Sequence, residues 1–252
     1  MDDASKKLTS LGCDSEGLSP CCTGSIVHCP GSSISYFKDE REVFNPAKLE
    51  LIDSSKNAYL FQGNMPETED SQFAYDVLMS SVKSHLEAMK KPLSDNPILI
   101  DVSFVNYTTE AEALNLEIEW YKKNPLKGCF WGYPLVGMAL DPLLIPFKSV
   151  RNILLRLLDI DGIPKLMDKL QELLQSTCPQ TTIIYMHCRG GVERMGIAAA
   201  CYRMQFLGHS YQVATSGKSN EFRSMIRNGI IWYAFYLREV KGISTVGLIE
   251  GQ

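Results

Sequence analysis

The sequence predicts an α/β fold with a largely parallel central sheet flanked by helices. Short apolar runs rich in β-branched and aromatic residues alternate with longer segments whose apolar residues recur at helical spacing. Strands that alternate with helices favour parallel pairing, with helices covering the sheet. The chain has 252 residues, which is long enough to bury a proper core.

Three parts are expected along the chain. Residues 1–35 are rich in Ser, Gly and Cys, show no periodicity and are expected to form a flexible tail. Residues 36–245 are expected to form a single domain, and residues 246–252 a C-terminal tail. The cysteines of the first part and His28 match no usual zinc spacing, so we expect no metal site there.

The elements of the domain are predicted from apolar periodicity. The runs expected to be strands are short ones within 34–64, then 97–102, 130–135 and 181–186. The segments expected to be helices are 70–89, 108–123, 163–175, a stretch from Gly196 onward, and 225–237. The carboxylates of 108–123 are expected to form a solvated face, opposite an inner face of Ala111, Leu114, Ile118 and Tyr121.

The stretch from Thr181 to Met204 joins a strand, a loop and a helix without a break. The loop, from His187 to Met195, contains two adjacent glycines, and a helix of small apolar residues follows from Gly196. Such a junction can hold an anion, because backbone N–H groups converge there and the positive end of the helix dipole faces the same spot.

A cysteine and an arginine flank this loop. Cys188 opens it and Arg194 closes it, with five residues between them. A cysteine beside a guanidinium at a helix N-terminus is expected to be a thiolate near neutral pH. Arg194 supplies a planar fork for two phosphate oxygens, which a lysine cannot do. The pair predicts a nucleophile aimed at a bound phosphate, although a cysteine after a buried strand can also be inert core.

The segment HCRGGVERMG resembles the signature loop of the cysteine-dependent protein tyrosine and dual-specificity phosphatases, which is His-Cys, five residues and Arg, usually followed by Ser or Thr and Gly. A looser similarity extends from about Ala58 to Glu239. The resemblance implies that Cys188 is the nucleophile and that His187 supports the loop by hydrogen-bonding to the backbone. It implies no metal and no cofactor. The implied phosphate-binding residues are Arg189, Gly190, Gly191, Val192, Glu193 and Arg194.

The resemblance also implies two-step phosphoryl transfer through a cysteinyl-phosphate, with an aspartic acid as general acid and then base. Asp141 follows the aromatic strand and Pro134, where the acid loop of this family belongs. Asp159 and Asp161 are the alternatives, since both lie nearer to the cysteine in sequence. Asp161 also has the position of a helix N-cap.

Two residues depart from the family pattern. Met195 stands where a Ser or Thr usually stabilises the leaving thiolate, so hydrolysis of the thiophosphate is expected to be slow. Glu193 adds a negative charge, which either pairs with Arg189 or Lys218 or repels highly anionic substrates. A phosphoprotein is therefore a more suitable substrate than a polyphosphoinositide.

Three functions remain open. The first is a protein phosphatase of the tyrosine or dual-specificity type, the second a pseudophosphatase that binds phosphoprotein with little turnover, and the third a structural domain that binds only inorganic anions. The net charge of −4 gives no general attraction to nucleic acid. No apolar run is long enough to span a membrane, and the N-terminus lacks an apolar signal core. We therefore expect a cytoplasmic protein with reduced thiols.

Overall fold

A six-stranded sheet lies at the centre of the molecule. The computed structural model describes residues 26–28, 41–107, 109–135, 137–145, 148–155, 158, 162–216 and 222–247. The strand order is β1-β5-β4-β6-β3-β2, and every neighbouring pair is parallel except β2 and β3. The strands are β1 (Ile26–His28), β2 (Glu50–Ser54), β3 (Ala58–Asn64), β4 (Ile98–Ser103), β5 (Gly128–Gly132) and β6 (Thr182–Cys188). The predicted, largely parallel sheet is confirmed.

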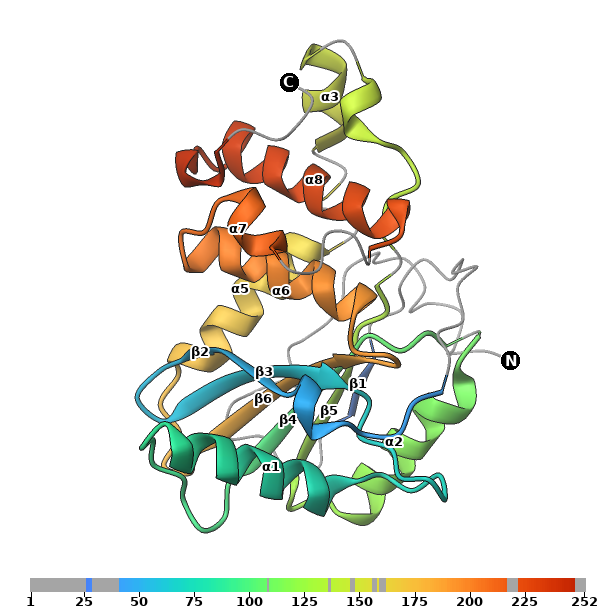
Figure 1. Ribbon diagram of the computed structural model, residues 1–252, viewed down its shortest axis with the longest axis vertical. Coiled ribbons are helices and arrows are strands. Elements are labelled where there is room, and N and C mark those ends of the chain that lie inside the picture. Colours follow the sequence, from blue (N-terminus) through green and yellow to red (C-terminus); the bar gives the residue numbers. More distant parts are fainter. Residues whose placement is uncertain are drawn as a thin grey trace, which may run out of the picture.

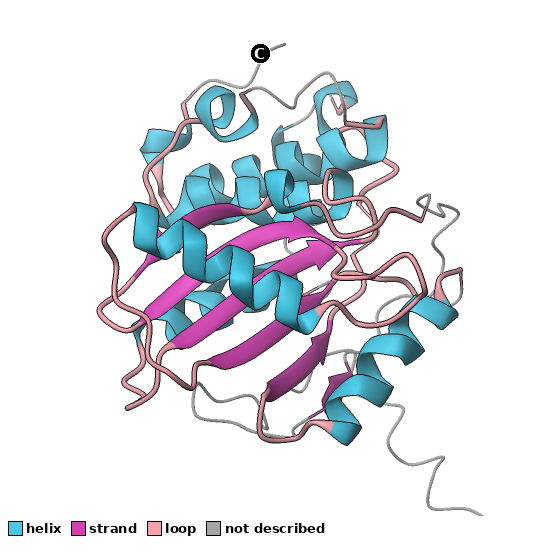
Figure 2. Ribbon diagram, turned by 60° about the horizontal axis from the view of Figure 1, so that its bottom comes forward, coloured by secondary structure: helices cyan, strands magenta, loops and turns pink. Residues whose placement is uncertain are grey.

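Helices cover both faces of this sheet (Figures 1 and 2). In Figure 1, α1 and α2 lie below the sheet, α5, α6 and α7 lie above it, and α8 and α3 lie beyond α6. The helices are α1 (Tyr75–Ala88), α2 (Ala111–Lys123), α3 (Lys148–Leu155), α5 (Ile163–Gln175), α6 (Glu193–Phe206), α7 (Tyr211–Thr215) and α8 (Ser224–Glu239). The short 3-10 turns are η2 (Pro46–Lys48), η3 (Pro142–Leu144) and η4 (Ser244–Val246). The predicted α/β class is therefore confirmed.

Alternate side chains of β6 pack into two separate hydrophobic cores. Ile184 and Met186 pack in the core formed with α5, α6 and α8, whereas Ile183 and Tyr185 pack in the core formed with α1 and α2. Successive side chains of a strand point to opposite faces. At the end of β6, His187 therefore faces the α1–α2 side, and Cys188 belongs to the core on the α6 side.

Several helix boundaries differ from the prediction. Helix α1 begins at Tyr75 rather than at residue 70, because Glu67 and Phe73 pair in a short antiparallel bridge just before it. Helix α6 begins at Glu193, three residues before Gly196, so Arg194 lies in its first turn. The short helix α7 was not predicted.

The first part of the chain is described only at residues 26–28. These residues form β1 and pair with β5, so this piece of the predicted tail belongs to the sheet. The rest of residues 1–40 lies outside the described residues, and the predicted domain boundaries stay predictions. Cys129 in β5 is disulfide-bonded, whereas Cys178, Cys188 and Cys201 are not. The expectation of reduced thiols is therefore wrong at Cys129.

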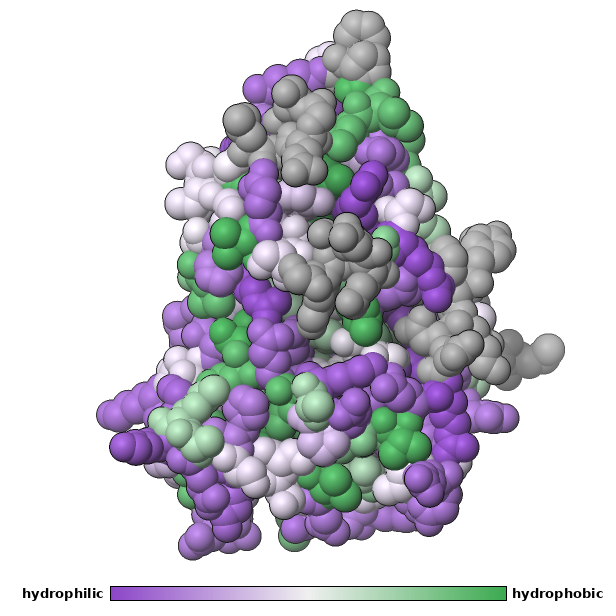
Figure 3. All heavy atoms as spheres, viewed as in Figure 1, coloured by the Kyte–Doolittle hydropathy of each residue, from purple (hydrophilic) through white to green (hydrophobic). Residues whose placement is uncertain are grey.

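The face of the molecule drawn in Figure 3 is largely hydrophilic, with apolar residues scattered over it. Apolar side chains gather near α3 in this view. Ile153 of α3 is 68% exposed, and Leu144 of η3 is 76% exposed. Among the described residues, no helix is long and apolar enough to cross a bilayer.

Candidate active site

A tight turn connects β6 to α6 and is shorter than the predicted loop. The strand continues through Cys188 and the helix begins at Glu193, so only residues 189–192 form the turn, with Val192 as the residue before the helix. Gly191 has a φ of +69°, and a Cβ there would lie 2.6 Å from the backbone nitrogen of Asn64. Only glycine fits this position without strain. Gly191 thus allows the turn to pack against the end of β3.

Gly190 occupies a different environment from Gly191. A Cβ at Gly190 would meet nothing within 4 Å. Its carbonyl oxygen accepts a hydrogen bond from Nζ of Lys48 at 2.9 Å, which links η2 to the turn. The two adjacent glycines therefore have different roles, since Gly191 is required by the backbone and Gly190 borders open space.

Cys188 lies at the carboxyl end of a parallel strand. Its Cα pairs with that of Asn64 at the end of β3, and the residue is fully buried. The carboxyl edge of a parallel sheet, where strands give way to helix N-termini, is the usual place for ligands in α/β proteins. The structure therefore places the predicted nucleophile at the expected edge.

Arg194 is held by a buried carboxylate. Its Nη1 and Nη2 donate to the two carboxylate oxygens of Glu110 at 2.6 and 2.7 Å, and Nη1 also donates to the carbonyl of Phe104 at 2.9 Å. Oε2 of Glu110 accepts a further hydrogen bond from the backbone N–H of Asn106 at 2.8 Å. The connection between β4 and α2 thus fixes the guanidinium of the signature arginine.

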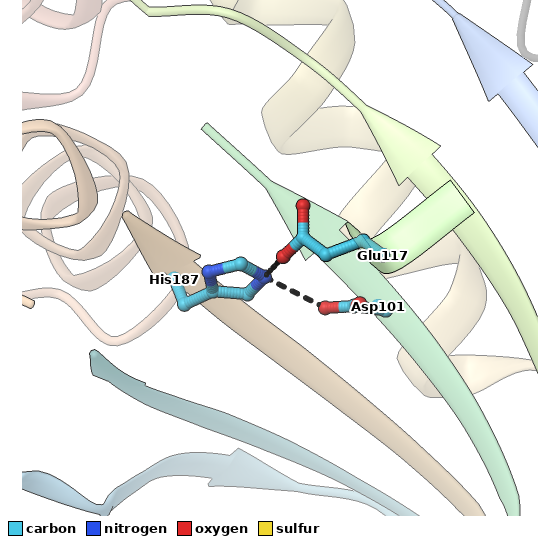
Figure 4. A group of neighbouring side chains, drawn as sticks. All are labelled: Asp101, Glu117 and His187. Carbon is cyan, nitrogen blue, oxygen red and sulfur yellow. Dashed lines mark hydrogen bonds and ion pairs between the residues drawn. The ribbon is translucent and has the colours of Figure 1, made fainter. Parts of the chain in front are cut away.

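His187 contacts two further carboxylates, as Figure 4 shows. Its Nε2 lies 2.8 Å from Oδ1 of Asp101 and 3.0 Å from Oε1 of Glu117, and all three side chains are fully buried. Ser103 donates its hydroxyl to Oε2 of Glu117 at 2.9 Å. The expectation that the His187 side chain bonds to the backbone is corrected, because its ring faces β4 and α2, which present carboxylates there.

The cluster shifts the pKa values of its members. Burial by itself would lower the pKa of His187, but the charges of Asp101 and Glu117 outweigh burial and raise this pKa to about 10. Burial raises the pKa of Glu117 to about 7, against the opposing effect of His187. The two carboxylates therefore favour the protonated form of His187, and burial favours the protonated form of Glu117.

Glu110 and Glu117 were not among the predicted site residues. The predicted solvated carboxylate face is wrong for both, because each is at most 5% exposed. A signal was present in the spacing, since Glu110, Leu114, Glu117 and Tyr121 recur at helical intervals and form one stripe. Buried Leu114 and Tyr121 place Glu117 on the inner face of α2, and Glu110 lies on the same stripe directly before the helix.

The charged residues around the turn are paired. Arg189 lies 3.4 Å from Glu67, and the same carboxylate pairs with Arg41 at 2.7 Å. Glu193 pairs with Arg223 at 3.1 Å. Arg189, one expected partner of Glu193, therefore lies next to Glu67 instead. Lys218, the other expected partner, lies outside the described residues.

Met195 is a core residue. Its side chain is fully buried among the apolar residues between the sheet and the helices on the α6 side. The helix therefore places a thioether in the core at the position where the resemblance implies a hydroxyl.

Asp141 has a local structural role. Its Oδ1 accepts a hydrogen bond from the backbone N–H of Leu143 at 2.9 Å, and the residue thus caps η3. The indole N–H of Trp232 in α8 donates to the carbonyl of Leu140 at 2.8 Å and anchors this segment. The alternatives Asp159 and Asp161 lie outside the described residues. The general acid stays a prediction.

No protein-family model matches the chain, and no curated protein matches it. Among solved structures, the chain is similar to kinase associated phosphatase with its catalytic cysteine replaced by serine. The identity is 15% and the TM-score 0.43, over 83% of this chain and 100% of that one. It is also similar to TpbA from P. aeruginosa, with 17% identity and a TM-score of 0.32 over 74% of this chain and 88% of that one. A mouse protein described as a dual specificity phosphatase, complexed with zinc tungstate, gives 13% identity and a TM-score of 0.37 over 83% and 98%. These identities are too low to assign an activity.

Proposed function

We propose that this protein is a cysteine-dependent phosphatase of the tyrosine or dual-specificity type that hydrolyses phosphomonoesters of phosphoproteins. The supporting observation is the tight turn at the carboxyl edge of the sheet, which begins after Cys188 and leads into a helix whose first turn contains Arg194. The first backbone N–H groups of a helix have no partner within the helix, and they attract anions together with the helix dipole.

In the first step, Sγ of Cys188 attacks phosphorus in line with the leaving oxygen. The S–P bond forms as the P–O bond breaks, while backbone N–H groups of the turn and Arg194 stabilise the equatorial oxygens. The leaving oxygen takes a proton from an aspartic acid, for which we propose Asp141. The products are a cysteinyl-phosphate and a free hydroxyl group.

In the second step, water attacks the cysteinyl-phosphate. The aspartate accepts a proton from this water, a new P–O bond forms, and the S–P bond breaks to restore the thiolate and release inorganic phosphate. Met195 offers no hydroxyl to stabilise the departing thiolate, so this step is proposed to limit turnover.

The ion pair between Glu110 and Arg194 supports a positioning role. A guanidinium fixed by two parallel hydrogen bonds has lost its rotational freedom before any substrate arrives. We propose that Glu110 sets the plane of Arg194, so that phosphate binding requires no reorganisation of the arginine.

A second candidate function is a phosphate-binding pseudophosphatase. The observation that favours it is the burial of Met195 in the core, next to Arg194 in sequence. Both candidates predict binding of phosphopeptides by Arg194 and the turn, and they differ in turnover.

The two candidates can be separated by assaying hydrolysis of an aryl phosphate and of phosphotyrosyl and phosphoseryl peptides. We expect turnover by the wild type, loss of turnover in Cys188→Ser, and retention of turnover in the matched control Cys201→Ser. Cys201 is also buried and not disulfide-bonded, and it lies further along α6. Tight phosphopeptide binding without turnover would favour the pseudophosphatase. Turnover that survives Cys188→Ser would contradict the proposed mechanism.

A further inference from the structure

Three successive backbone N–H groups of the turn have no acceptor among the described residues. They belong to Gly190, Gly191 and Val192. A run of N–H groups that passes through a residue of positive φ, here Gly191 at +69°, can form a concavity for an anion. Such a concavity exists only if the peptide units are turned so that their N–H groups converge. The contacts that set this orientation are therefore part of the site.

Two peptide units of the turn are held from outside it. The carbonyl of Arg189 accepts a hydrogen bond from the backbone N–H of Met65 at 3.3 Å, and the carbonyl of Gly190 accepts one from Nζ of Lys48 at 2.9 Å. In a trans peptide unit, the C=O and the N–H of the next residue point in opposite directions. The contact with Met65 therefore turns the N–H of Gly190 away from the end of β3. The contact with Lys48 turns the N–H of Gly191 away from η2.

The segment that carries Lys48 is tied to the end of β3. The backbone N–H of Asn45, the residue that caps η2, donates to Oδ1 of Asn64 at 2.9 Å. Nδ2 of Asn64 in turn donates to the carbonyl of Val43 at 2.9 Å. Asn64 ends β3, and its Cα pairs with that of Cys188. Lys48 is thus placed at the same edge of the sheet as the candidate nucleophile.

The ammonium of Lys48 also acts on the turn through its charge. It pairs with Oε2 of Glu42 at 2.6 Å, and its side chain is 29% exposed. An ammonium group has three N–H donors, of which the contacts with Glu42 and Gly190 use two. A carbonyl that accepts from a cation polarises its peptide unit, and this makes the N–H at the other end a stronger donor. For the contact with Gly190, that N–H belongs to Gly191.

We propose that Lys48 is a positioning residue of the turn, which holds the carbonyl of Gly190 outward so that the N–H of Gly191 faces a bound oxyanion. This peptide unit needs such a contact because it joins two glycines, whose backbone rotates more freely than that of other residues. If it rotated, the carbonyl oxygen would face the anion and repel it. The inference rests on the proposed function in treating the turn as the phosphate site, but its test measures binding and not turnover.

The role of Lys48 can be tested by calorimetric titration with inorganic phosphate. We expect Lys48→Met to bind phosphate on the order of tenfold more weakly than wild type, because the contact to Gly190 and a nearby positive charge are both lost. Lys48→Arg keeps a positive charge and N–H donors, so its affinity should stay within about threefold of wild type. Equal affinities of Lys48→Met and wild type would overturn the proposal.

Two control variants separate the contact with Gly190 from other effects of the lysine. Glu42→Gln breaks the ion pair of Lys48 and leaves Gly190 untouched, so phosphate should bind as in wild type or more tightly. Lys91→Met removes an ammonium that donates to Ser54 at 2.9 Å, beside the start of β3 at the opposite edge of the sheet. It should bind phosphate like wild type. A loss of affinity in either control as large as that in Lys48→Met would overturn the proposal.

The orientation of the peptide unit can be followed by ¹H–¹⁵N NMR. In wild type, phosphate should shift the N–H signal of Gly191 and leave that of Gly208, which lies beyond the end of α6, in place. In Lys48→Met, we expect a smaller shift of Gly191 at saturating phosphate and an unchanged thermal unfolding temperature. A full shift of Gly191 in Lys48→Met would overturn the proposal. If this variant does not fold, the absence of a Gly191 shift in wild type or in Lys48→Arg would do so.

This inference and the proposed function can fail separately. Phosphate binding that depends on Lys48, without hydrolysis of an aryl phosphate, would support the role of Lys48 and contradict the phosphatase. Hydrolysis that requires Cys188, together with equal phosphate affinities of Lys48→Met and wild type, would overturn the role of Lys48 alone. A wild-type protein that binds no phosphate would overturn the inference.

Discussion

Glu110 and Arg194 form a buried bidentate ion pair, with hydrogen bonds of 2.6 and 2.7 Å. Glu110 directly precedes α2, and Glu117 lies seven positions further along the same stripe, where it contacts His187. One segment of the chain thus supports both residues that flank the candidate nucleophile in the signature motif. A shift of α2 would disturb His187 and Arg194 together.

We expect Arg194→Lys to weaken phosphopeptide binding by about tenfold or more. Lysine keeps the positive charge but cannot make two parallel hydrogen bonds, and a charged hydrogen bond contributes about 1.5–3 kcal/mol. Binding should be measured by calorimetry in a Cys188→Ser background, which prevents turnover. The control Arg203→Lys alters an arginine of the same helix that pairs with Glu50, and it should bind like the parent. Equal phosphopeptide affinities of the Arg194→Lys and Arg203→Lys variants would contradict a role for the planar guanidinium of Arg194.

The two glycines of the turn should respond differently to alanine. We expect Gly191→Ala to lower the free energy of unfolding by about 2 kcal/mol or more, because its φ is +69° and its Cβ would meet the backbone of Asn64. Gly190→Ala should cost little, since its Cβ points into open space. Urea unfolding of both variants tests this difference. Similar costs would show that the turn has another conformation.

Much of the fold follows from local patterns. The apolar run from Thr181 to Met186 predicted β6, which continues two residues further, to Cys188. The helix predicted at 163–175 matches α5, whose Pro164 in the first turn favours a start there. These elements are long or strongly periodic. Helix α7 was missed because it is only five residues long and offers too few positions for a period.

The side-chain contacts that hold the site residues in place were harder to predict from the sequence. Asp101 lies in the middle of a buried strand, where a charge requires a partner, but a sequence does not identify that partner. The contact forms because β4 lies beside β6 in the sheet, with Asp101 opposite Tyr185 and Ser103 opposite His187. Strand order is a long-range property, whereas the periodicity of α2 is local and does place Glu117 inward.

Asp141→Asn should slow the first step in a way that depends on the leaving group. A general acid contributes about 10²–10⁴-fold when the leaving oxygen is basic and little when it leaves readily as an anion. The ratio of wild-type to variant rates should therefore grow across a series of aryl phosphates of rising phenol pKa. Because Asp141 also caps η3, a thermal unfolding measurement must accompany the series. A constant ratio would direct attention to Asp159 and Asp161.

Met195→Thr should increase the rate of thiophosphate hydrolysis while lowering stability by about 2–4 kcal/mol, because it removes a buried side chain. Met204→Thr is the matched control, since Met204 is equally buried in the same helix but lies nine residues beyond Met195. Steady-state turnover at low temperature should rise only in Met195→Thr. An equal response in both variants would indicate a nonspecific effect of loosening the core.

In the proposed mechanism, Cys188 becomes phosphorylated during the reaction. This step can be tested by mixing the protein with a ³²P-labelled aryl phosphate, quenching with acid within milliseconds and locating the label by peptide mapping. We expect a burst of phenol release that matches the label on the Cys188 peptide, followed by slow turnover. Turnover without any label on Cys188, or label on another residue, would contradict it.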